Sequence, residues 1–163
     1  MRRKFGKIIS DLATKDKKIV LIVGDIGYGI FDEFRKKHPK RFFNLGICEQ
    51  SLIGFASGVA LRGLKPWVYT ITPFLIERPF EQIKLDIDQQ KANVKLVGFA
   101  DYPTLGPTHS ELNAKKLMAL TRNIKSFYPK SSKETEIFSR KMARIKGPFF
   151  MSLKTDKYLN KNW

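Results

Sequence analysis

The chain has 163 residues, of which 31 are lysine or arginine and 15 are aspartate or glutamate, so its formal net charge is +16. This length suits a single domain with a sizeable core, and a hydrophobic content of 42% excludes a disordered chain. The single cysteine, Cys48, excludes an internal disulfide framework; with no secretory signal pattern and no apolar run of about 20 residues, we expect a cytoplasmic protein without a membrane segment.

In chain order, apolar runs alternate with amphipathic stretches, beginning with a continuous β-branched run at 19–25 that is typical of a buried strand. Strands are expected at 19–25, 41–46, 66–72, 94–100, 124–129 and 148–153, and helices at 31–39, 48–63, 74–90, 114–123 and 132–147. Pro79 must lie near a helix start or mark a kink. This alternation predicts an α/β fold, a parallel sheet of about six strands with helices on both faces. Residues 1–153 would form one domain and 154–163 a surface extension.

Four loops follow predicted strands, and open parallel sheets bind ligands at the carboxyl ends of their strands. These loops contain GDIGYG, NLGICEQ, TITPF and GPTHS. The glycine spacing of GDIGYG does not fit the dinucleotide fingerprint, and no Walker A sequence occurs. No histidine, cysteine or acidic cluster has metal-ligand spacing, so we expect no metal held by this chain alone.

Two residues in these loops could carry chemistry. Glu49 opens a very apolar helix, where its carboxylate either interacts with the helix dipole, worth about 0.3–1 kcal/mol, or holds a proton beside an apolar ligand. The residues alone favour the dipole role. His109 lies at the expected ligand edge and is either a structural residue or a functional one.

The net charge has two interpretations. A basic face could bind nucleic acid by releasing counterions from phosphate, or it could be a solvated surface that attracts anionic small ligands. Lysine and arginine are spread along the chain, and no nucleic-acid-binding motif occurs, so the sequence favours the second interpretation.

The segments GDIGYG, RFFNLGICEQSLIGFASGVALRGLKPWV, TITPFLIERPFEQI and GPTHSE together resemble the pyrimidine-binding domain of transketolase-type thiamine diphosphate enzymes. The run F-x-N-x-G-I-x-E-Q, followed by a Gly/Ala-rich helix, is also found in deoxyxylulose-phosphate synthases and in the beta-type subunits of pyruvate dehydrogenases. The resemblance implies that Glu49 is catalytic. It would hydrogen-bond a ring nitrogen of the aminopyrimidine and promote the tautomer that accepts a proton from the thiazolium carbon.

The resemblance also assigns roles to other positions. Asp25 and Ile26 would approach the thiazolium side of thiamine diphosphate, Ile47 would line the pyrimidine pocket, Phe74 would pack on the aminopyrimidine, His109 would be a catalytic residue near the substrate, and Arg3 would hold a substrate phosphate. Tyr128 stands where sugar-phosphate transketolases usually place an arginine, which leaves the acceptor substrate open.

The family binds the diphosphate and Mg²⁺ on a separate domain through a G-D-G…N motif, which does not occur here. We therefore expect the small subunit of a split transketolase, sharing thiamine diphosphate with a diphosphate-binding partner that holds Mg²⁺, in an α2β2 assembly that transfers a two-carbon ketol unit between sugars or sugar phosphates. The alternatives are a subunit of an acyloin-forming or decarboxylating thiamine diphosphate enzyme, a non-catalytic subunit of the same fold, and a nucleic-acid-binding domain.

Overall fold

A computed structural model describes residues 1–99 and 105–154 of the chain. The end of the predicted strand at Ala100 and residues 155–163 of the predicted surface extension lie outside the described residues.

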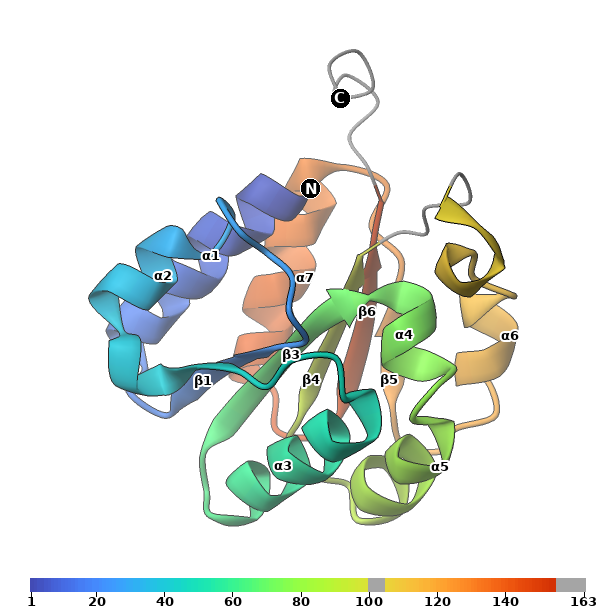
Figure 1. Ribbon diagram of the computed structural model, residues 1–163. Coiled ribbons are helices and arrows are strands. Elements are labelled where there is room, and N and C mark those ends of the chain that lie inside the picture. Colours follow the sequence, from blue (N-terminus) through green and yellow to red (C-terminus); the bar gives the residue numbers. More distant parts are fainter. Residues whose placement is uncertain (100–104, 155–163) are drawn as a thin grey trace.

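Six parallel strands form one sheet, which confirms the predicted fold class (Figure 1). The strand order is β2-β1-β3-β4-β6-β5, with β1 at Ile19–Val23, β2 at Phe42–Asn44, β3 at Lys65–Ile71, β4 at Lys95–Phe99, β5 at Lys125–Phe127 and β6 at Phe149–Leu153. All five residues of β1 are buried, as expected for a parallel strand covered on both faces. Alternate residues of β1 belong to two separate apolar clusters, one on each face of the sheet.

Helices cover both of these faces. On one face lie α1 (Arg2–Lys15), α2 (Asp32–Lys37) and α7 (Ser132–Arg144). The other face is covered by α3 (Glu49–Leu61), α4 (Thr72–Ile76), α5 (Phe80–Gln82), the π-helix η2 (Ile83–Gln89) and α6 (Ala114–Met118). Two short 3-10 helices, η1 (Pro39–Arg41) and η4 (Pro107–His109), lie in the connections.

Helix α1 is an element that the sequence analysis did not predict, because the segment was considered only as a possible targeting signal. Its apolar residues Phe5, Ile9 and Ala13 recur every four positions and are fully buried against the sheet. This spacing places them on one face of a helix, and the basic residues between them face solvent.

The segment predicted as one helix at 74–90 is divided into three parts. Helix α4 ends at Ile76, α5 begins directly after Pro79, and η2 follows from Ile83 to Gln89. Proline has no backbone N–H to continue the helical ladder, so the interruption at Pro79 agrees with the prediction that this residue lies near a helix start.

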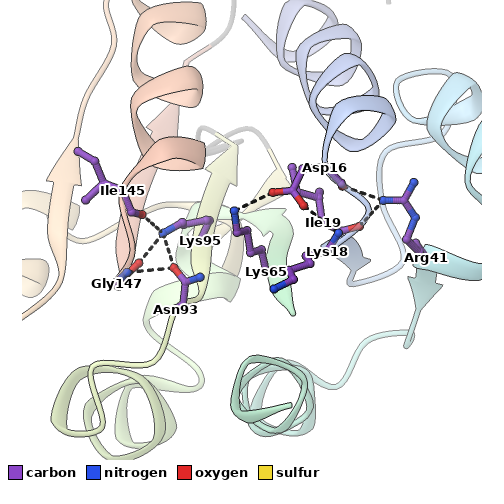
Figure 2. A network of polar contacts seen from close by, with 9 residues as sticks. All are labelled: Asp16, Lys18, Ile19, Arg41, Lys65, Asn93, Lys95, Ile145 and Gly147. Carbon is purple, nitrogen blue, oxygen red and sulfur yellow. Dashed lines mark hydrogen bonds and ion pairs between the residues drawn. The ribbon is translucent and has the colours of Figure 1, made fainter. Parts of the chain in front are cut away.

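A polar network ties together the amino ends of the strands (Figure 2). The Lys65 ammonium pairs with the Asp16 carboxylate at 2.7 Å. The Lys95 ammonium donates to the Asn93 side-chain oxygen at 2.8 Å and to the carbonyls of Ile145 and Gly147. Lys95 is only 1% exposed, and its burial, together with the nearby charge of Lys65, lowers its pKa to about 7.

No helix within residues 1–99 and 105–154 is long and apolar enough to cross a membrane.

Candidate functional site

The strand order reverses at β1, because β2 and β3 lie on its two sides. In open parallel sheets such a switch point, at the carboxyl edge, is where ligands bind. The loop after β1, the turn after β2 and helix α4 after β3 all start from this edge. The predicted site residues on these segments are therefore described together.

Glu49 is the first residue of α3, and its side chain is buried although it is charged. The chain reaches it through Gly46, whose φ of +78° is accessible to glycine at little cost, and through Cys48, the residue before the helix. The Cys48 thiol donates a hydrogen bond to the Leu45 carbonyl at 3.0 Å, which fixes this turn. The Glu49 residue is only 6% exposed, and its Oε1 accepts a hydrogen bond from Nη1 of Arg78 at 2.8 Å.

Arg78 also lies over an aromatic ring. Its guanidinium carbon is 3.6 Å from the centre of the Phe74 ring, and the centre of the His109 ring is 4.8 Å from that of Phe74 in an edge-to-face arrangement. The Thr108 hydroxyl and Nδ1 of His109 are 3.1 Å apart, which helps to orient the imidazole. The structure thus brings Glu49, Phe74 and His109 into one continuous cluster, with Arg78 at its centre.

The cluster can receive a flat group that carries N–H donors. The Arg78 guanidinium is such a group, because it is planar and presents N–H donors at its edge. It contacts the face of Phe74 and the carboxylate of Glu49 at the same time. An aminopyrimidine has the same two properties, a flat face and an amino group, so these side chains fit the pyrimidine end of thiamine diphosphate.

A second polar group surrounds Asp25 in the loop after β1. The Asn44 amide donates to Oδ1 of Asp25 at 3.1 Å and accepts from the Asp25 backbone N–H at 2.9 Å. The Tyr28 hydroxyl donates to the same Oδ1 at 3.0 Å. The hydrogen bonds from Asn44 and Tyr28 lower the pKa of Asp25, so its exposed carboxyl group is ionised at neutral pH.

The remaining predicted site residues lie at different depths. Ile26 is half-buried against the core, whereas Ile47 is 73% exposed just before α3. Arg3 is exposed on α1. Its neighbour Arg2 instead faces the sheet, where its Nε donates to the Tyr69 hydroxyl at 3.0 Å and its guanidinium lies over the ring of Phe99.

A small hollow of about 100 Å³ adjoins the Asp25 loop and is lined in part by Ile26, Tyr28 and Asn44. Across the described part of the chain, no three histidine, cysteine or acidic side chains are arranged to hold a metal ion.

Arg78, Asn44 and Tyr28 belong to these groups but were missed from the sequence. Arg78 lies four positions after Phe74, a spacing that places two side chains on one helical face, so this signal was available. Asn44 and Asp25 come from different strands, β2 and the end of β1, and their contact depends on the pairing of Val23 with Asn44. No local pattern contains that information.

Comparison with known proteins gives a match over almost the whole chain. The family described as "Transketolase, pyrimidine binding domain" matches residues 1–160. One of the two subunits named for the apulose-4-phosphate transketolase of Actinobacillus succinogenes is 37% identical over 123 residues, which are 74% of this chain and 40% of that protein. The 1-deoxy-D-xylulose-5-phosphate synthase of Thermotoga sp. is 35% identical over 134 residues, covering 79% of this chain and 22% of that protein.

Among solved structures, a split-gene transketolase described as an inactive beta4 tetramer superposes with a TM-score of 0.85 and 32% identity. The match covers 94% of this chain and 50% of that one. The chain spans less than half the length of the curated relatives it matches.

Proposed function

This chain belongs to the family of transketolase pyrimidine-binding domains, and from that premise we propose that it is the small subunit of a thiamine diphosphate-dependent split transketolase. It would supply the pyrimidine half of the cofactor site, and a partner subunit would supply the half that holds the diphosphate and Mg²⁺. Two relatives favour this proposal, one named as a transketolase subunit and one described as a split-gene transketolase.

The observation that carries this proposal is the bridging of Glu49 and Phe74 by one planar group, the Arg78 guanidinium. When bound, thiamine diphosphate supplies the carbanion chemistry of two-carbon transfer. Glu49 holds or shares a proton with a ring nitrogen of the aminopyrimidine, and its burial keeps water from competing for that proton. Phe74 supports the flat face of the ring, and Arg78 moves aside or shares the carboxylate.

Two further residues complete the proposed roles on this chain. His109 contacts the edge of Phe74, so its imidazole is placed to exchange protons with a substrate held beyond the ring. Asp25, ionised and fixed by Asn44 and Tyr28, presents negative charge at the carboxyl edge and would face the thiazolium side. Arg3 would contact a substrate phosphate.

The partner subunit would dock on the exposed side of α3. Large apolar side chains gather there: Ile47 is 73% exposed, Leu61 70% and Phe55 38%, and Phe55 packs edge-to-face on the exposed Phe43. Exposed apolar patches of this kind mark interaction sites. Helix α3 also carries Glu49, so a partner bound on this side would cover the cofactor glutamate from solvent. The net charge of +16 favours an acidic partner.

The test uses the assembled complex with a partner that contains the G-D-G…N motif. Two-carbon transfer from a ketose donor is measured for wild type, Glu49→Gln and the matched control Glu81→Gln, whose exposed carboxylate lies on α5. Because a positioned proton-transfer group contributes about 10²–10⁴-fold, Glu49→Gln should lower kcat by at least about 100-fold while the complex still forms. The control should stay within twofold of wild type. A Glu49→Gln complex that turns over normally would contradict the catalytic role and favour a non-catalytic subunit.

A second function is favoured by the match to a 1-deoxy-D-xylulose-5-phosphate synthase. In that case the complex would use a 2-oxo acid donor and release carbon dioxide. Supplying the same complex with pyruvate in place of the ketose distinguishes the two reactions, since only the second releases carbon dioxide.

A further inference from the structure

A second hollow, of about 360 Å³, lies at the amino edge of the sheet and so on the opposite side of the domain from the Glu49 cluster. Its lining includes Lys91, Asn123, Lys125, Lys146, Gly147 and Phe149, and we call it the lysine hollow. Its volume falls in the range of small-molecule sites, which are about 300–1,000 Å³.

The three lysines of the hollow come from three different segments that the fold holds together. Lys91 follows η2 in a left-handed turn with φ of +50°, Lys125 begins β5, and Lys146 lies in the loop before β6. The buried carboxylate of Asp88 fixes the first two segments, because it accepts backbone N–H groups from Arg122, Asn123 and Ile124, just before β5. The hollow is therefore formed by ordered backbone.

The third segment is held by the network around Lys95 (Figure 2). The Asn93 side chain accepts from both the Gly147 backbone N–H, at 3.0 Å, and the Lys95 ammonium, at 2.8 Å. The Lys95 ammonium also lies 4.5 Å from the centre of the Phe149 ring, directly behind the wall of the hollow. Positive charge thus lies both around the hollow and behind it.

These charges are not balanced by the protein itself. Lys91, Lys125 and Lys146 are exposed, and none of them forms an ion pair with any residue in 1–99 or 105–154. The nearby carboxylate of Asp88 already accepts three backbone hydrogen bonds. Three ammonium groups around one concave surface raise the local concentration of anions, and a ligand with several negative charges can contact all three.

We propose that the lysine hollow binds a small polyanion of the oligophosphate class, either free or as the phosphate chain of a nucleotide. The volume of the hollow leaves room for more than one phosphate group, and three lysines from three segments favour a multivalent anion over a single phosphate. This site is independent of the proposed cofactor site, which lies at the other edge of the sheet.

The test titrates the full chain with inorganic tripolyphosphate at about 0.15 M salt, where surface charges are screened beyond about 8 Å. Backbone amide shifts in NMR spectra locate the binding, and calorimetry gives its affinity. The triple variant Lys91→Gln, Lys125→Gln, Lys146→Gln should bind at least tenfold more weakly. A matched triple variant, Lys36→Gln, Lys40→Gln, Lys133→Gln, changes the net charge equally at exposed positions elsewhere and should stay within twofold of wild type.

The same titration with ATP distinguishes a nucleotide from a free oligophosphate, because a contribution from the nucleoside makes ATP bind more tightly than tripolyphosphate. Circular dichroism checks that both triple variants are folded, and Lys125→Gln alone, with an expected loss of about threefold, serves if the triple variant is not. Equal losses in both triple variants, amide shifts spread over the whole surface, or no saturable binding would overturn the proposal. Binding of duplex DNA or RNA through these lysines without binding of tripolyphosphate would also overturn it.

Discussion

Replacing Arg78 with methionine leaves the buried carboxylate of Glu49 without its cation. The variant loses a hydrogen bond of 2.8 Å to a charged group, worth about 1.5–3 kcal/mol, and a contact over the Phe74 ring worth about 0.5–2 kcal/mol. The Arg78 side chain is 39% exposed, so solvent screening reduces both contributions. We expect a net loss of about 2 kcal/mol in the free energy of unfolding, which corresponds to about 4–8 °C in Tm for a domain of this size.

Urea unfolding at pH 7 measures this loss, and a double-mutant cycle assigns it to the pair. Glu49→Gln removes the buried charge, so the double variant Glu49→Gln, Arg78→Met should be more stable than the sum of the single changes by about 1–2 kcal/mol. The control is Arg35→Met, because Arg35 and Asp32 are 3.6 Å apart with side chains 58% and 59% exposed, and its loss should be below about 0.5 kcal/mol. A coupling near zero between Glu49 and Arg78 would refute the reasoning.

Two other predictions concern separate parts of the molecule. The pKa of Lys95 is about 7 in the folded chain and about 10.5 when unfolded, so between these values the unfolded state binds a proton that the folded state has released. The free energy of unfolding should therefore rise with pH from 7 to 10, by up to about 1.4 kcal/mol per pH unit, relative to Lys95→Met; identical pH profiles in urea unfolding would show that Lys95 keeps its proton. Leu61→Asp on the exposed side of α3 should weaken partner binding at least tenfold in calorimetry, whereas Ile137→Asp on α7, a residue 52% exposed on the opposite face, should not. Equal affinities for the two variants would place the partner elsewhere.

The fold could be predicted from the sequence because its strands carry a strong local signal. The β-branched run at Ile19–Val23 predicts a doubly covered strand, and every one of its residues is buried. The long predicted helix at 74–90 was wrong in its continuity, because the backbone breaks at Pro79 and then widens into a π-helix. Helix α1 shows that an amphipathic pattern is overlooked when a segment is read only for its charge.

The candidate site could be predicted only in part. The residues Glu49, Phe74 and His109 were named from a resemblance of motifs, and the structure brings them together. The bridging role of Arg78 depends on the packing of α4 against the start of α3, which follows from tertiary structure. Lys95 is similar, since a lysine at the start of a strand gives no sign that three acceptors will enclose its ammonium.

The two strands at the margins of the sheet limit how this protein can assemble. Both β2 (Phe42–Asn44) and β5 (Lys125–Phe127) have three residues, and basic side chains begin or precede them at Arg41 and Lys125. Unpaired strand edges are templates for adding a strand from another chain, and short, charged edges give such a strand little to bind. Association with another protein chain is thereby directed away from sheet extension and toward contacts between helices.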